Sequence, residues 1–526
     1  MASSPQNSHS GLSSGGDFSV SPLGWLALLT AFSFLLMGYH PGLEDDAFYL
    51  AAIKRNLNSA LFPHDADFFR LQFQATIFDK LIAWSVRLTH LPLGWAVLLW
   101  QFAAIFILLH GCWRISRRCF SRPEAHWAAV TTIAVLLTLP VSGIAMTLAD
   151  QYLHPRTLAT AAILAAIVAV IDRRLWLAGA LLAVAFSIHA IMAAFGVSFC
   201  AFLFWSLRGP QTRRSSATPV AAALLPLGWI FEPASDAWRQ AASTRSFYFL
   251  GRWEWYEWLG VFGPLVLLYV LRQFLRRNDR KDGNDENDRN NRNDSALLPL
   301  ASSLLYYGVF QTVAGLLIML PLSLERLRPF EPMRYLHLLY LLFFLIAGGL
   351  LGSYVFDRKV YRWLALFVPL SAGMFYAQRQ MFPASAHLEL PGIATQNPWL
   401  QAFDWIRQNT PVDSLFALDP RYVTLPGEDY HGFRALAERS VLADYDKDGG
   451  MAARVPRLAP RWLKEVTAQN GWQNFQPPDF ERLKRDFGVT WVVLQRNDAN
   501  LTAENPEGKA MTCPYQNRQL QVCRLY

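Results

Sequence analysis

The chain has 526 residues, of which 53% are apolar and only 17% carry a charge. The apolar residues form long blocks rather than short amphipathic stripes, so the composition indicates an integral membrane protein. The net charge of +8 does not indicate nucleic-acid binding, because the arginines lie mainly in short segments between apolar blocks. Five cysteines are too few for a disulfide scaffold.

The first 20 residues are rich in Ser and Gly and predict a disordered tail, residues 1–20. They lack the basic start and the cleavage site of a signal peptide, so the first apolar block is expected to remain as an anchor. Apolar windows that could cross a ~30 Å hydrocarbon core predict about eleven spans. They lie at 22–38, 91–112, 126–148, 157–171, 175–188, 190–207, 218–231, 258–275, 296–320, 335–355 and 361–376.

Alternate connections between these windows are basic, and basic connections usually face the cytoplasm. They contain Arg114, Arg117, Arg118, Arg122, Arg173, Arg174, Arg208, Arg213, Arg214, Arg272, Arg276, Arg277, Arg280, Lys281, Arg358, Lys359 and Arg362. The N-terminus is then cytoplasmic, and the other connections lie outside. One cytoplasmic loop, 276–294, has no apolar residue and is predicted to be disordered.

Residues 377–526 have an ordinary globular composition. Their pattern predicts helices at 400–409, 431–439 and 480–487 and strands at 414–419 and 489–494. This alternation predicts a small extracytoplasmic α/β domain, which leaves residues 21–376 as an all-α polytopic membrane domain with an outer loop at 40–90. Cys513 and Cys523 bracket a short hairpin and either form a disulfide or remain free thiols.

The first outer loop opens with Asp45 and Asp46, directly after the first apolar block and before the helical pattern AFYLAAIKRNL. Acids at the mouth of a membrane span are costly and usually functional, which predicts a catalytic role for at least one of them. The alternative is capping of the following helix. Farther along, Asp65 and Asp67 more readily serve a turn or a cap, although their spacing could hold a hard cation.

The next outer loop contains Asp150, His154 and Arg156 within seven residues. These side chains could position a phosphate and supply a second acid near the first loop, or Asp150 and Arg156 could form a structural ion pair. His189 lies between two apolar stretches, where a histidine is either hydrogen-bonded within the bundle or functional.

A late outer loop contains three arginines, Arg326, Arg328 and Arg334. Their position outside opposes the usual charge bias, so membrane orientation does not explain them. A guanidinium group meets phosphate oxygens with two parallel hydrogen bonds, which predicts phosphate recognition. The alternative is salt bridges to the neighbouring Glu325 and Glu331.

A first outer loop that opens Asp45-Asp46-Ala47-Phe48-Tyr49, about eleven spans, basic residues in a late outer loop and a C-terminal outer domain together resemble the GT-C superfamily of membrane glycosyltransferases. The segments DDAFYLAAI, LHPRTLA and GFRALAER resemble bacterial GT-C-like proteins more closely. The chain has no WWDYG-like run of the oligosaccharyltransferases.

The resemblance implies inverting transfer of a sugar from a polyprenyl-phosphate donor to an envelope glycan, lipid or protein, at the outer face of the bacterial inner membrane. It implies that Asp45 is the catalytic base and that Asp150 matches the second-loop acid. The phosphate would be held by His154, Arg156, His189, Arg326, Arg328 and Arg334. Asp46 or Asp150 could hold Mg²⁺ or Mn²⁺, which this chemistry does not require. A lipid-carrier transporter or flippase and a non-catalytic membrane scaffold are the alternatives.

Overall fold

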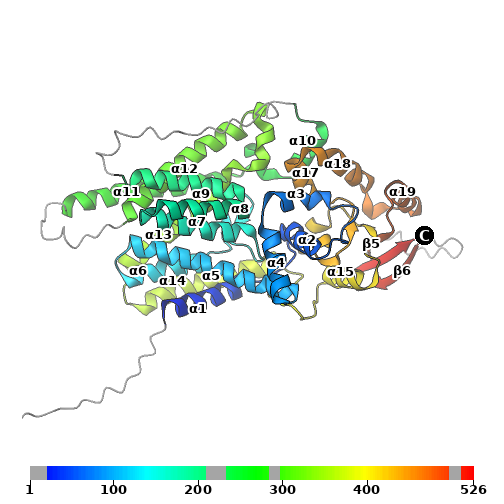
Figure 1. Cartoon of the computed structure of the whole chain (residues 1–526), viewed down its shortest axis with the longest axis horizontal. Coiled ribbons are helices and arrows are strands. Elements are labelled where there is room, and N and C mark those ends of the chain that lie inside the picture. Colours follow the sequence, from blue (N-terminus) through cyan, green and yellow to red (C-terminus); the bar gives the residue numbers. More distant parts are fainter. Residues whose placement is uncertain (1–20, 209–232, 283–295, 497–510) are drawn as a thin grey trace, which may run out of the picture.

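The computed structural model of the chain describes residues 21–208, 233–282, 296–496 and 511–526. It is mostly helical. A bundle of apolar helices forms one end of the molecule, and a part that contains a sheet forms the other (Figure 1). The predicted tail 1–20, the window 218–231 and most of the predicted loop 276–294 lie outside the described residues.

Ten helices of the described residues form the bundle. They are α1 (Pro22–Met37), α5 (Leu93–Cys119), α6 (Pro123–Val135), α7 (Pro155–Ile171), α8 (Leu175–Ile188), α9 (Ala190–Ser206), α11 (Trp255–Asp282), α12 (Leu297–Met319), α13 (Tyr335–Leu351) with the π-helix η7 (Gly352–Phe356), and α14 (Val360–Met381). Five of them, α5, α11, α12, α13 with its flanking turns, and α14, are long and apolar enough to cross a membrane.

The exterior of this bundle is apolar. Val266, Leu267 and Val270 of α11 are each more than half exposed, and a surface of this kind is stable against lipid rather than water. The chain is therefore a membrane protein. The shorter apolar helices α1, α7, α8 and α9 occupy predicted windows, so the described part of the chain does not confirm eleven spans.

Two predictions for the bundle are wrong in detail. The window 126–148 is not one helix, because α6 ends at Val135 and a hairpin follows, with β1 (Pro140–Val141) antiparallel to β2 (Met146–Thr147). Pro140 and Gly143 lie in this hairpin and interrupt a helix. The loop predicted from residue 276 starts later, because α11 continues to Asp282.

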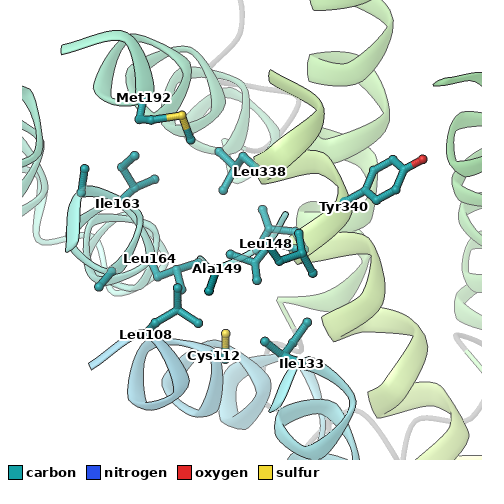
Figure 2. Close-up of a cluster of buried hydrophobic side chains, with 14 of the residues drawn as sticks. Leu108, Cys112, Ile133, Leu148, Ala149, Ile163, Leu164, Met192, Leu338 and Tyr340 are labelled. Carbon is teal, nitrogen blue, oxygen red and sulfur yellow. The ribbon is translucent and has the colours of Figure 1, made fainter. Parts of the chain in front are cut away.

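The interior of the bundle is packed closely, because small residues let the helices approach. An added Cβ at Gly111 of α5 would lie 2.9 Å from Leu164, and one at Gly348 of α13 would lie 2.4 Å from Thr132. Figure 2 shows Leu108 and Cys112 of α5 facing Leu164 of α7 across this core. This close packing between helices fixes the positions of the helix ends, and therefore of the polar loops that begin there.

The basic connections meet one another at one end of the bundle. Arg118 forms an ion pair with Asp172, and Arg358 forms one with Glu124. The guanidinium of Arg173 donates to the carbonyl oxygen of Leu207. The alternate connections lie at the other end, where they meet the C-terminal part (Figure 1).

The C-terminal part contains a five-stranded sheet of strand order β4-β3-β5-β7-β6. Strand β3 (Leu415–Ala417) is parallel to β4 (Ser440–Val441) and β5 (Trp491–Gln495), while β7 (Leu520–Leu525) is antiparallel to β5 and β6 (Met511–Gln516). Around the sheet lie α15 (Pro398–Asn409), η8 (Tyr422–Thr424), α16 (Phe433–Ala437), α17 (Lys447–Arg454), η9 (Pro456–Leu458), α18 (Ala459–Ala468), η10 (Trp472–Asn474) and α19 (Pro477–Phe487).

Both faces of this sheet are buried. Phe416 and Val493 contribute to the cluster with Trp399 and Phe403 of α15, while their chain neighbours pack on the other side against Phe480 and Leu483 of α19. This alternation has the period of two that a strand imposes. Cys513 and Cys523 form a disulfide between β6 and β7, which confirms the paired alternative.

The connection between α1 and α5, predicted as the first outer loop, is helical and packs against the C-terminal part. It contains α2 (Asp46–Leu57), α3 (Asp67–Ala75) and α4 (Phe78–Thr89), and α10 (Asp236–Ser243), η3 (Ser246–Tyr248) and η4 (Leu250–Arg252) lie nearby. Phe48 of α2 shares a buried cluster with Trp238 of α10 and Trp462 of α18. Two 3₁₀ segments, η5 (Leu322–Phe330) and η6 (Pro332–Arg334), lead into α13. This shared core holds the polar loops in fixed positions.

Candidate active site

The loop before α2 has a defined shape. Gly42 has a φ of 81°, a left-handed conformation that glycine adopts without strain. Its amide donates to Asp46 Oδ2 at 2.6 Å, so Asp46 closes the loop from the first turn of α2. The predicted helix is confirmed, and Asp46 is 2% exposed.

Asp45 precedes α2 and makes no capping hydrogen bond with its side chain. Its Oδ1 lies 3.6 Å from Lys447 Nζ, and its Oδ2 lies 4.0 Å from His154 Nε2. Desolvation raises the pKa of Asp45, but Lys447, His154 and Arg454 outweigh this effect and hold the pKa well below its usual range. Asp45 is therefore an ionised carboxylate that remains partly exposed.

His154 is fixed in one orientation. Its Nδ1 accepts a hydrogen bond from the amide of Arg156 at 2.9 Å, which caps α7. Burial, followed by the charge of Arg156, lowers the pKa of His154, so the neutral ring carries its proton on Nε2, the nitrogen nearest Asp45. His154 is therefore placed to donate toward Asp45 or toward a ligand bound beside it.

Asp150 and Arg156 form a buried ion pair. This is the structural alternative for these two residues, and it commits one oxygen of Asp150 to the guanidinium group. Asp150 Oδ2 still lies 4.0 Å from His154 Nδ1. Because Nδ1 already accepts a hydrogen bond, Asp150 makes none with His154, and Mg²⁺ or Mn²⁺ binding at Asp46 or Asp150 stays a prediction.

Asp45 opens into a pocket of about 200 Å³. Four cationic side chains line it, and they come from three segments that are far apart in the chain: Arg245, Arg334, Lys447 and Arg454. Glu44 and Asp446 are its other acidic side chains. Burial raises the pKa of both carboxyl groups, which favours their neutral forms and weakens their opposition to a bound anion.

Glu331 joins two of the four cations behind the pocket. It is 4% exposed and forms ion pairs with Arg334 and with Arg454, the latter at 2.6 Å. Arg334 comes from the end of η6 and Arg454 from the end of α17. One carboxylate therefore connects the transmembrane part to the C-terminal part at the pocket wall.

Some of the predicted site residues lie in or beside the Asp45 pocket, and others lie away from it. Asp45 and Arg334 line one pocket, with His154 beside Asp45 and His189 stacked on His154 at 6.3 Å between ring centroids. His189 Nδ1 accepts from the amide of Met192 at 3.4 Å and caps α9.

Arg326 and Arg328 lie elsewhere. Arg326 donates to the carbonyl oxygen of Pro233 at 2.8 Å. Arg328 donates to the carbonyl oxygen of Met319 and lines a separate pocket of about 600 Å³. Neither arginine lines the pocket with Asp45, because η5 directs Arg326 to the backbone at Pro233 and Arg328 to the end of α12. Their role in phosphate binding stays a prediction.

Sequence reasoning missed Arg245, Lys447 and Arg454. Lys447 and Arg454 are seven residues apart, the spacing of two helical turns, so both can project from one face of a helix. That spacing could have indicated two cations on one face of a helix. Gly449 and Gly450 between them concealed it, because glycine is unfavourable inside a helix.

The buried carboxyl of Asp46 predicts a pH effect on stability. Burial raises the pKa of Asp46 to about 7, whereas an unfolded Asp titrates at about 3.9. The folded state therefore keeps a proton that the unfolded state loses, and stability falls as pH rises from about 4 through about 7. We expect the melting temperature of the wild type to fall relative to that of Asp46→Asn between about pH 5 and about pH 8.

Asp67→Asn is the matched control for this comparison, because it removes a carboxylate that is 52% exposed from the same connection between α1 and α5. Thermal unfolding of all three proteins in one detergent provides the measurement. Parallel pH profiles for the wild type and Asp46→Asn would contradict the assignment of a retained proton to Asp46.

The fold and the pocket define a polytopic membrane protein with a carboxylate and four cations at the junction of its helical bundle and its α/β part. Residues 397–453 match the model of a domain of unknown function (DUF6798). The matched segment runs from the start of α15 into α17 and includes Lys447. Comparison with curated proteins gave no match.

Proposed function

We propose that the chain is a GT-C-like membrane glycosyltransferase that transfers a sugar from a polyprenyl-phosphate donor to an envelope acceptor with inversion. The observation that carries the proposal is the pocket that Asp45 shares with Arg245, Arg334, Lys447 and Arg454. A base and a set of cations in one crevice are what such a reaction requires, because a proton must leave the acceptor while a phosphate leaves the sugar.

Asp45 acts as the general base in this proposal. Its low pKa keeps it ionised at neutral pH, but the same cations that lower the pKa also weaken its basicity. A phosphate that binds among these cations neutralises part of their charge and raises the basicity of Asp45. Binding of the donor therefore prepares the base. His154 Nε2 lies 4.0 Å from Asp45 Oδ2.

The cations bind the phosphate of the donor and stabilise it as it leaves. Arg334 and Arg454 are already held by Glu331, so little reorganisation is needed when charge develops. The pocket of about 200 Å³ is smaller than the ~300–1,000 Å³ typical of sites for drug-sized ligands. This size favours a single sugar residue with its phosphate over an oligosaccharide.

Two features support placing this end of the molecule outside the cytoplasm. The basic connections gather at the opposite end of the bundle, as the positive-inside rule requires of a cytoplasmic face. The disulfide between Cys513 and Cys523 belongs to an oxidising compartment. The inner membrane of a bacterium, with the pocket on its outer side, meets both conditions.

Binding of polyprenyl phosphate without sugar tests the cationic pocket. We expect Arg334→Gln and Lys447→Gln each to weaken binding by about 10- to 100-fold, since a hydrogen bond to a charged group contributes about 1.5–3 kcal/mol. The measurement is titration of the full-length protein in nanodiscs with the lipid phosphate, followed by intrinsic fluorescence.

Arg457→Gln is the control, because Arg457 is exposed, lies three residues beyond Arg454 and does not line the pocket. Its affinity should equal that of the wild type. Equal affinity in all four proteins would show that the pocket does not receive the phosphate, and the proposed function would then lose its support.

A further inference from the structure

A second group of titratable side chains lies behind the loop that carries Asp45, outside the pocket. His40 Nδ1 lies 3.4 Å from Glu389 Oε2, and His431 Nε2 lies 2.9 Å from the same oxygen. One ligand atom from each residue lies within 4.8 Å of the other two. Both histidines are buried, with exposed fractions of 0% and 2%.

His431 Nε2 forms a hydrogen bond with Glu389 Oε2, but other buried polar atoms of these three side chains have no partner within the described part of the chain. Neither ring nitrogen of His40 has a hydrogen-bond partner there, and His431 Nδ1 and Glu389 Oε1 also lack one. Leaving buried polar atoms without partners is costly. Phe382 packs on the His40 ring with 4.5 Å between ring centroids, so His40 is enclosed rather than solvated.

We propose that His40, Glu389 and His431 bind a divalent transition-metal ion of the zinc class. Two imidazoles and one carboxylate are a common zinc ligand set, and ligands at about 2.0–2.1 Å from the metal lie about 3.3 Å apart in a tetrahedron. The distances from Glu389 Oε2 to His40 Nδ1 and to His431 Nε2, 3.4 and 2.9 Å, are close to this value. The distance between the two histidine nitrogens, which is at most 4.8 Å, shortens with small side-chain movements. A fourth position is filled by water.

The metal joins three distant segments of the chain. His40 follows α1, Glu389 follows α14, and His431 precedes α16. Backbone bridges already pair Tyr39 with Leu388 and Leu43 with His431. The ion therefore fixes the loop from both sides, and its ligand His431 directly follows Tyr430, which lines the Asp45 pocket.

Metal analysis of the full-length protein tests this proposal directly. The protein is purified through a tag that contains no histidine, loaded with Zn²⁺, desalted and analysed for bound zinc. We expect about one zinc per wild-type chain, and we expect His431→Asn and Glu389→Gln to lower zinc affinity by at least about tenfold, as loss of ligand support does in metal sites. His64→Asn is the control, because the His64 ring contacts the carbonyl oxygen of Asp413 instead.

A second measurement needs no variant that could misfold. Co²⁺ added to the metal-free wild type should produce the visible absorption bands of a tetrahedral site with nitrogen and oxygen ligands, and Zn²⁺ should abolish them. A wild type that retains no more zinc than Glu389→Gln, or that gives no such bands, would overturn the proposal. Both readouts are independent of lipid binding and sugar transfer, so neither result bears on the cationic pocket.

Discussion

Asp45→Asn is expected to lower the rate of sugar transfer by about 10²- to 10⁴-fold, the usual contribution of a general base. The amide has nearly the same shape as the carboxylate but cannot accept the acceptor's proton. Removing the negative charge also leaves Lys447, 3.6 Å away, free to interact with the phosphate. Binding of polyprenyl phosphate should therefore be retained or strengthened while transfer is lost. Transfer to a panel of envelope acceptors in nanodiscs is the measurement.

Asp67→Asn is the matched control for this experiment as well, because Asp67 lies in the same connection between α1 and α5 but does not line the pocket. It should transfer sugar at the wild-type rate. A wild-type rate in Asp45→Asn would exclude Asp45 as the base. A wild type that moves the lipid across the bilayer but never transfers sugar would favour the transporter alternative.

Arg434→Met is expected to destabilise the C-terminal part by about 3–5 kcal/mol, the cost of leaving a buried charge without its partner. Arg434 donates two hydrogen bonds of 2.9 Å to Asp448 and also pairs with Asp65. The side chains of both carboxylates are fully buried. For a domain of 150–250 residues this loss corresponds to a fall in melting temperature of about 6–20 °C. Thermal unfolding in detergent measures it.

Arg407→Met tests whether the effect belongs to the buried network. Arg407 pairs with Asp404 on the surface, where such a pair contributes at most about 1 kcal/mol. Adding Asp65→Asn and Asp448→Asn to Arg434→Met should restore much of the stability, because the unpaired charges are then absent. A melting temperature for Arg434→Met equal to that of Arg407→Met would contradict the assigned role.

The sequence was informative where a local pattern or a charge had one physical explanation. The pattern after Asp46 predicted α2, and the elements that flank β3 and β5 were predicted close to their observed bounds. Arg326, Arg328 and Arg334 were singled out because their charges opposed the membrane bias, and of the three Arg334 lines the pocket with Asp45. The elements follow from local periodicity, while the argument for Arg334 depended on a rule that applies to the whole chain.

What could not be predicted depends on contacts between distant segments. An added Cβ at Gly450 would lie 2.5 Å from Arg245 Nε, so glycine allows α17 to pack against the segment after α10. A glycine pair reads as a poor helix in isolation, and only this packing explains it. Likewise Asp65, read as a turn residue or a cation ligand, is the partner of Arg434, 369 residues away.

The acid and two of the cations of the pocket come from different parts of the chain, so related proteins could change one without the other. The carboxylate of Asp45 belongs to the first loop, whereas Lys447 and Arg454 are supplied by α17. Substitutions confined to that short helix would alter which anions are accepted and leave the acid untouched. In the proposed enzyme, selectivity would thus change in the C-terminal part while the proposed base, Asp45, stayed the same.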